Sequence, residues 1–237
     1  MRTLIRPLTR FYFRLWQPVY RRRYDRLALE TLDGVPLLML PGVFNGVLLR
    51  TGAFLAQTLT TLPLAASGDV SALDLGTGSG LGAVFAARRG FRVVGVDINP
   101  EAVRCARINV LLNRVEDRVE IRLGDLFAPV AGERFDLVLF NPPFYQGAPR
   151  HDLDYAWRGT DIFERFAAGL PAALKPGGRA LVVLSSDGRG EELLAALRAH
   201  PRVGRASPSA LEVVARRDLG NEVLTVYSVS SDEDHSL

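Results

Sequence analysis

The sequence predicts an α/β domain built on a doubly wound, mostly parallel sheet of seven strands that ends in a C-terminal antiparallel hairpin. Short apolar runs alternate with amphipathic stretches from residue 70 onward, which is typical of a parallel sheet with helices on both faces. Four successive runs end in polar residues, namely Asp74, Asp97, Asp125 and Asn141. Two later runs flank Asp218-Leu219-Gly220-Asn221, a turn sequence that favours a hairpin.

Strands are predicted where a short apolar or β-branched run is bounded by turn residues. The parallel strands cover residues 70–75, 92–97, 119–124, 135–140 and 179–185. The C-terminal hairpin pairs residues 211–216 with residues 222–230. Together these runs give the seven strands of the predicted sheet.

Helices are predicted from apolar residues at helical spacing and from their end signals. They cover residues 47–62, 81–89, 100–112, 160–174 and 190–200. Asn99 fits the N-cap of the helix that starts at Pro100, and a proline is favoured at that first position. Pro176-Gly177-Gly178 is expected to stop the helix before it. Residues 32–46 are predicted to form a hairpin or a loop.

The length and composition fit one large domain with an N-terminal addition. The chain has 237 residues, of which 48% are hydrophobic, and no apolar run reaches the ~18 residues that a membrane span requires. We predict the domain at residues 66–230, preceded by a segment at 1–65 that covers substrate and cofactor, and followed by an acidic tail at 231–237. The single cysteine, Cys105, excludes an internal disulfide and fits a reducing compartment, so we expect a cytoplasmic protein with a buried thiol.

The first 26 residues form an arm that is rich in arginine and aromatic side chains. Its basic residues are Arg2, Arg6, Arg10, Arg14, Arg21, Arg22, Arg23 and Arg26, against the single acid Asp25. The simplest interpretation is a helical arm that packs its aromatic side chains on the domain. The main alternative is an electrostatic contact with the substrate, with RNA or with a ribosome. A membrane-surface helix and a targeting peptide are further alternatives.

A glycine turn, Asp74-Leu-Gly-Thr-Gly-Ser-Gly80, joins the first predicted strand of the sheet to a helix. Backbone N–H groups and the positive end of the helix dipole converge there, so the turn favours a ligand, although a tight turn without one has the same pattern. Asp97 follows Asp74 by 23 residues, where a carboxylate accepts both hydroxyls of a ribose. That spacing also fits NAD. However, the dinucleotide pattern from Gly76 requires a small residue where this chain has Leu81.

These residues carry a resemblance to a known family. The glycine turn, Asp97, Gly124-Asp125-Leu126-Phe127 and Asn141-Pro142-Pro143-Phe144 resemble the class I S-adenosylmethionine-dependent methyltransferases, whose fold is Rossmann-like. More narrowly, the sequence resembles the branch with an Asn-Pro-Pro-aromatic motif. That branch contains HemK-like release-factor glutamine N5-methyltransferases and the adenine-N6 and guanine-N2 methyltransferases of nucleic acids. Residues 154–161 are similar to a segment of the glutamine enzymes, which favours that group.

The resemblance implies a set of cofactor-binding residues. These are Asp74, Gly76, Thr77, Gly78, Gly80, Asp97, Ile98, Asp125, Leu126 and Asn141. The glycines would let the backbone approach the methionine part of S-adenosylmethionine, and Asp74 would face its ammonium group. Asp97 would hold the ribose hydroxyls. Asp125 would accept from the adenine amino group, while Leu126 or Phe127 packs against the ring.

The resemblance also implies a catalytic group, and its residues are Asn141, Pro142, Pro143 and Phe144. The acceptor in this branch is a planar amide or aryl amine. The side-chain carbonyl of Asn141 and the backbone carbonyl of Pro142 would each accept one N–H of that acceptor. The prolines fix the backbone, and Phe144 offers a face for stacking. Because positioning is the main contribution, no general base is required.

We therefore expect an N-methyltransferase that acts on a protein glutamine side chain and releases S-adenosylhomocysteine. RNA or DNA adenine-N6 or guanine-N2, or a small molecule, are alternative acceptors, and a catalytically silent cofactor-binding module is an alternative of another class. No Cys/His cluster has metal-ligand spacing. His151 is a candidate proton relay, although a solvated loop histidine is the simpler interpretation.

Overall fold

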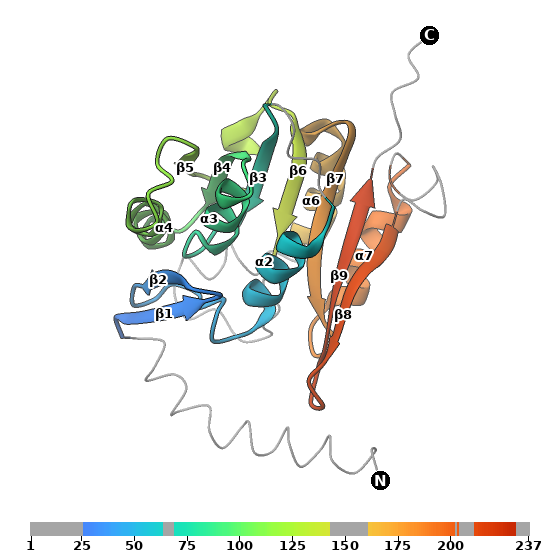
Figure 1. Ribbon diagram of the computed structural model, residues 1–237. Helices are drawn as coiled ribbons and strands as arrows, with labels where there is room; N and C mark the ends of the chain where they lie inside the picture. The colour runs from blue at the N-terminus through green and yellow to red at the C-terminus, as the bar shows by residue number, and fades with distance from the viewer. Residues whose placement is uncertain (1–25, 64–68, 143–160, 202, 204–210, 231–237) are drawn as a thin grey trace.

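A computed structural model describes residues 26–63, 69–142, 161–201, 203 and 211–230 (Figure 1). Within these residues, seven strands form one sheet in the order β5-β4-β3-β6-β7-β9-β8. The strands are β3 (Ser71–Leu75), β4 (Arg92–Asp97), β5 (Val119–Leu123), β6 (Phe135–Phe140), β7 (Leu174–Ser185), β8 (Leu211–Asp218) and β9 (Val223–Ser230). The predicted α/β fold and its seven-stranded sheet are confirmed.

The strand order places a topological switch point at the centre of the sheet. From β3 the chain runs outward through β4 to β5, and it then returns to the other side of β3 with β6 and β7. All of these neighbours pair in parallel, whereas β9 pairs antiparallel with both β7 and β8. The carboxyl ends of β3 and β6 therefore flank the place where open α/β sheets bind ligands.

Helices cover both faces of the sheet (Figure 1). On one face lie α2 (Thr51–Thr61), α3 (Leu81–Arg88) and α4 (Pro100–Leu112), whose buried side chains share a core with Leu137 and Leu139 of β6. On the other face lie α6 (Ile162–Ala173) and α7 (Gly190–Ala199), which share a core with Val138 and Phe140. The alternation along β6 thus directs successive side chains to opposite faces. A 3-10 turn, η1 (Ala128–Val130), precedes β6.

A separate hairpin packs against α4. It is formed by β1 (Ala28–Leu32) and β2 (Val35–Met39), and it therefore starts earlier than the predicted residues 32–46. Its two-residue turn, Asp33-Gly34, has φ values of 48° and 80°, the positive values that a type I′ turn requires. Cys105 of α4 lies buried under β2, and its thiol donates to the carbonyl of Leu38 at 3.2 Å. The prediction of a buried thiol is confirmed.

The boundary between α6 and β7 differs from the prediction. The helix was predicted to end at residue 174, before Pro176-Gly177-Gly178, and α6 ends at Ala173. The next strand was predicted to start at residue 179, but β7 already begins at Leu174. Leu174 pairs with Phe135, and the register then shifts before Arg179 pairs with Leu137. A Cβ on Gly178 would lie 2.8 Å from the carbonyl oxygen of Phe135, so glycine permits this close pairing. The Pro-Gly-Gly stretch is therefore an irregular part of a strand.

The remaining predicted elements agree with the structure to within a few residues at their ends. Asn99 caps α4, since its side chain accepts from the backbone N–H of Glu101 at 2.9 Å. Among the described residues, no helix is long and apolar enough to cross a membrane.

Candidate functional site

The polar residues predicted at the strand ends meet at one edge of the sheet. Asp97 is the last residue of β4, and Asp74 is the last residue but one of β3. Asp125 follows β5 by two residues, and Asn141 directly follows β6. Because these four strands are parallel neighbours, their carboxyl ends share an edge, and β3 and β6 lie at the switch point. The structure thus brings the predicted residues to one site.

The three glycines of the turn have different surroundings although all have positive φ values of 64° (Gly76), 55° (Gly78) and 81° (Gly80). Gly76 is exposed, and a Cβ placed on it would meet nothing within 4 Å. A Cβ on Gly80 would instead lie 3.0 Å from the Cα of Ala106 in α4. Gly76 therefore leaves space for a ligand, whereas Gly80 is required for the packing of two helices.

Asp97 is buried behind the turn and accepts hydrogen bonds from two backbone groups. Its carboxylate accepts from the N–H of Gly78 at 2.8 Å and from the N–H of Asn99 at 2.9 Å. Burial raises the pKa of Asp97, and these N–H bonds partly oppose that rise. The N–H of Ile98 also acts on this carboxylate. Since a carboxylate has about four lone-pair positions, about one remains for a hydroxyl donor such as that of a ribose. Ile98, which follows it, is half-buried.

The buried side chain of Asp74 stabilises the glycine turn and the start of α3. One of its carboxylate oxygens accepts from the hydroxyl of Thr77 at 2.6 Å and from the backbone N–H of Ala83 at 2.8 Å. Ala83 lies in the first turn of α3, which Gly80 cannot cap with a side chain, so Asp74 takes the role of a cap. Burial raises the pKa of Asp74 to about 6. Its second oxygen packs against Gly82, and a Cβ on Gly82 would lie only 2.6 Å from that oxygen.

Asp125 forms an ion pair with Arg165 of α6. This hydrogen bond raises the pKa of the Arg165 guanidinium. The backbone of Leu126 has φ 45°, which turns the chain so that Phe127 stacks on Phe166 with ring centroids 5.9 Å apart. A Cβ on Gly169 would lie 2.4 Å from the Phe127 ring, so this glycine makes room for it. Both Asp125 and Phe127 are partly exposed at the edge of the sheet.

Asn141 presents a buried oxygen that lacks a partner. Within the described part of the chain, its side-chain carbonyl oxygen Oδ1 makes no hydrogen bond, although it is out of contact with solvent. Pro142 after it is buried. An unpaired buried carbonyl is costly, by about 1–3 kcal/mol, so it indicates a place where a ligand donor binds. Pro143, Phe144, His151 and residues 1–25 of the arginine arm lie outside the described residues.

Asn109 of α4 is a residue of the site that the sequence pattern did not reveal. It is fully buried, and its amide nitrogen donates to the carbonyls of Leu38 at 2.7 Å and Ser79 at 2.8 Å. Its oxygen accepts from the N–H of Leu38 at 2.6 Å. Asn109 therefore ties β2 to the glycine turn. The signal available in the sequence was a polar residue on the apolar face of a helix.

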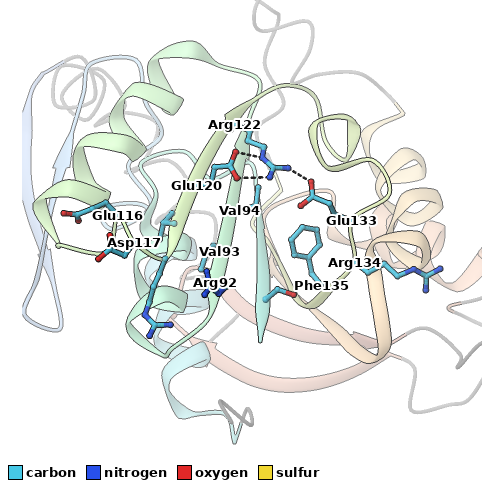
Figure 2. A pocket seen from close by; sticks show the side chains of 13 residues that line it. Arg92, Val93, Val94, Glu116, Asp117, Glu120, Arg122, Glu133, Arg134 and Phe135 are labelled. Atoms are coloured by element: carbon cyan, nitrogen blue, oxygen red, sulfur yellow. Dashed lines mark hydrogen bonds and ion pairs between the residues drawn. The ribbon is translucent and has the colours of Figure 1, made fainter. Parts of the chain in front are cut away.

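A cavity of about 480 Å³ lies at the opposite, amino-terminal edge of the sheet (Figure 2). Its lining includes the first residues of β3, β4, β5 and β6, and Figure 2 shows Arg122 between Glu120 and Glu133. Charges of both signs surround it, and none of the described site residues lines it. This cavity is therefore distinct from the candidate site.

Residues 34–204 match the methyltransferase small domain family, over most of the chain. The chain belongs to this family. The match identifies an S-adenosylmethionine-dependent methyltransferase domain. The described residues fit that cofactor, because Gly76 leaves space beside the turn and Asp97 places a carboxylate at the end of β4.

Proteins similar to this chain include methyltransferases for different acceptors. Ribosomal RNA small subunit methyltransferase C of Alcanivorax borkumensis is 40% identical over 139 residues, which cover 58% of this chain and 39% of that protein. The release factor glutamine methyltransferase of Cereibacter sphaeroides is 36% identical over 129 residues, which cover 48% of this chain and 46% of that protein. The chain thus spans less than half the length of these two relatives.

The fold is similar to that of solved methyltransferases. The T. thermophilus 16S rRNA N2 G1207 methyltransferase, in complex with AdoMet and guanosine, superposes with a TM-score of 0.63 at 23% identity. The superposition covers 87% of this chain and 50% of that one. At this identity the likeness concerns the fold alone, and it agrees with the sheet described above.

Proposed function

We propose that this protein transfers the methyl group of S-adenosylmethionine to the side-chain amide nitrogen of a glutamine in another protein. The observation that carries the proposal is the buried Oδ1 of Asn141 at the carboxyl end of β6, which has no hydrogen-bond partner among the described residues. A carbonyl oxygen accepts an N–H, so the group it binds is a donor such as the –NH2 of an amide.

The chain's own residues position the two reactants. Asp97, at the end of β4, holds the ribose, and the open side of Gly76 admits the methionine part. Asp125 accepts from the adenine amino group. Asn141, two strands from Asp97 across the switch point, receives one N–H of the acceptor. Holding the N–H groups fixes the plane of the amide, so that the nitrogen lone pair, which is perpendicular to this plane, is aligned with the methyl group.

The transfer requires no metal and no general base in this proposal. S-adenosylmethionine supplies a methyl group on a positively charged sulfur. The nitrogen lone pair forms the new C–N bond as the C–S bond breaks, S-adenosylhomocysteine leaves, and one N–H proton passes to water. Asn141 contributes by orientation and by stabilising the positive charge that develops on nitrogen.

The glutamine acceptor is supported by the relative from C. sphaeroides. Arg50, Arg165 and Arg189 come from elements at the carboxyl edge, and each is paired with an acid: Glu222, Asp125 and Glu192 respectively. RNA binding depends on cations that neutralise phosphates. These three paired arginines supply less of that attraction, whereas Arg216 and Arg217 of β8, which are exposed and level with the end of β7, leave positive charge at the same edge. The cytoplasmic location stays a prediction.

The relative from A. borkumensis favours a second acceptor, the exocyclic amine of an RNA base. Such an amine presents the same planar –NH2 group to Asn141. The arginine arm, together with Arg216 and Arg217 of β8, would then supply the phosphate contacts.

A labelling experiment separates the two acceptors. We would incubate the wild-type protein and Asn141→Ala with methyl-labelled S-adenosylmethionine and a cell lysate, and then count the label in protein, RNA, DNA and small molecules. We expect label on glutamine in one protein with the wild type, and a loss of at least about a hundredfold with Asn141→Ala at unchanged cofactor affinity. Label confined to RNA would replace glutamine with the base amine. Full activity of Asn141→Ala would refute the proposed role of this residue.

A further inference from the structure

A second buried oxygen lacks a partner near the same edge. The hydroxyl of Thr51, the first residue of α2, makes no hydrogen bond within the described part of the chain, although Thr51 is only 5% exposed. The third such oxygen is Oδ1 of Asn113, at the far end of α4. An unsatisfied hydroxyl in the interior is unfavourable, so it requires an explanation.

The contacts of α2 place Thr51 over the end of β6. Its neighbour Arg50 pairs with Glu222 at 3.5 Å, and Glu222 accepts from the hydroxyl of Ser185, the last residue of β7, at 2.9 Å. On the other side, a Cβ on Gly52 would lie 3.1 Å from Leu81, the first residue of α3, which follows β3 and the glycine turn. The start of α2 thus reaches from the end of β7 to the start of α3. Because β6 lies between β3 and β7, we infer that α2 starts near the carboxyl end of β6.

Asn141 belongs to the same face of the sheet. Leu137 and Leu139 share a core with α2 and α3. Extending the alternation of β6 by one step past its last residue, Phe140, assigns Asn141 to the same face. Val183 of β7 also belongs to that core, and Ser185 is the next residue of its set. The unpaired oxygens of Thr51 and Asn141 are therefore on one face, at the end of one strand.

We propose that Thr51 is a second residue that positions the methyl acceptor. Its hydroxyl donates to the carbonyl oxygen of the carboxamide whose N–H is accepted by Asn141. This inference rests on the proposed function and extends it. Hydrogen bonds to both the carbonyl oxygen and the N–H of the carboxamide also fix the rotation of that group. It explains why the hydroxyl has no hydrogen-bond partner among the described residues. A hydroxyl that is satisfied only by substrate stabilises the bound state at the expense of the free protein.

The chain offers a matched control on the same helix. Thr58 of α2 is also buried, but its hydroxyl donates to the carbonyl of Phe54 at 2.8 Å. Thr51→Val and Thr58→Val each replace a hydroxyl with a methyl group of similar volume. Thr51→Ser keeps the hydroxyl.

Steady-state kinetics, cofactor titration and thermal unfolding test the inference. For Thr51→Val we expect kcat/KM for the glutamine-containing acceptor to fall about tenfold, as loss of one hydrogen bond does. We expect cofactor Kd to be unchanged and Tm to rise by about 2–4 °C, because an unsatisfied group is removed. Thr51→Ser should retain acceptor turnover. Thr58→Val should leave kcat/KM for the acceptor and cofactor Kd unchanged, and its Tm should not rise.

An unchanged kcat/KM of Thr51→Val for the acceptor would overturn the inference, whatever its Tm. A weaker cofactor Kd in Thr51→Val would overturn it also, because the hydroxyl would then belong to the cofactor site. These results leave the proposed function intact when the wild type labels glutamine. Label on RNA alone would refute the glutamine acceptor and, with it, the carboxamide contact assigned to Thr51.

Discussion

The backbone N–H of Gly78 donates a 2.8 Å hydrogen bond to the carboxylate of Asp97. The glycine turn after β3 and the end of β4 are thus joined through one buried acid. The backbone adds a second link, since the N–H of Thr77 donates to the carbonyl of Val96 at 2.9 Å. The two loops that face the proposed cofactor are therefore held in a fixed relation to each other.

Replacing Asp97 should weaken cofactor binding. Asp97→Ala removes the acceptor proposed for the ribose and leaves the N–H of Gly78 without its partner, so we expect Kd for S-adenosylmethionine to rise by about 10- to 100-fold, as for loss of charged hydrogen bonds. Calorimetric titration measures this. Asp117→Ala, at the cavity on the opposite edge, is the control and should bind normally. Equal affinity of the two variants would place the cofactor elsewhere.

Adding a methyl group at Gly76 should block the ligand without an unusual loss of stability. Gly76 and Gly132 have positive φ values of 64° and 86°, and a Cβ on either would meet nothing within 4 Å. Each change to alanine should therefore lower the free energy of unfolding by about 1–2 kcal/mol. Only Gly76→Ala should weaken cofactor binding, because only Gly76 lies in the turn. Urea unfolding and cofactor titration of the pair check this, and equal cofactor affinities would show that the open side of Gly76 is not used.

The acid beneath the turn should make stability depend on pH. Burial raises the pKa of Asp74 to about 6 from 3.8, so between these values the folded state binds more protons than the unfolded state. The free energy of unfolding then decreases as pH rises through this window and is level above it. The difference corresponds to roughly 3 kcal/mol at most.

Asp74→Asn keeps an oxygen for Thr77 and Ala83 but has no charge to desolvate. We therefore expect this variant to be more stable than the wild type at pH 7.5, with the gain shrinking as pH approaches 4. Urea unfolding from pH 4.5 to 7.5 measures both proteins. Asp97, whose pKa is also raised, keeps part of the pH dependence in the variant. If the free energy of unfolding varied with pH in the same way for the wild type and Asp74→Asn, the assignment of the pH dependence to Asp74 would be contradicted.

Asn109 should matter for both folding and the site. Asn109→Ala leaves the N–H of Leu38 and the carbonyl of Ser79 unpaired inside the protein, so we expect a loss of about 2–4 kcal/mol in the free energy of unfolding. Cofactor affinity should fall too, because Ser79 belongs to the turn. Asn113→Ala removes a bond to the carbonyl of Pro36 in the same hairpin but none to the turn, and it should leave affinity unchanged. Chemical unfolding and cofactor titration distinguish the two residues.

Residues with local signals were predictable from the sequence. Asp97 and Asn141 end apolar runs, and the start of α4 at Asn99-Pro100 follows from capping. The start of the N-terminal hairpin was missed although Asp33-Gly34 is a strong turn signal. The start of β7 was predicted late, at residue 179, because Pro176-Gly177-Gly178 is typical of a turn, whereas pairing of Leu174 with Phe135 already starts the strand.

Contacts between distant residues were not predictable in this way. The pairing of Asp125 with Arg165 spans 40 positions, and the bond from Asn109 to Leu38 spans 71. No periodicity encodes such a partner, because it depends on how the elements pack. The hydroxyl of Thr51 is similar: the sequence shows a threonine, and only the fold shows that the hydroxyl has no hydrogen-bond partner among the described residues.

The central claim is that S-adenosylmethionine binds at the carboxyl edge of the sheet with its reactive end toward Asn141. A crystal structure of the full chain with S-adenosylhomocysteine tests it most directly. We predict ribose hydroxyls within hydrogen-bond distance of Asp97, the amino-acid end over Gly76, and the sulfur facing the side of the site that holds Oδ1 of Asn141. A nucleoside bound in the cavity between Arg92 and Arg134 at the opposite edge, or a sulfur that faces away from Asn141, would contradict the claim.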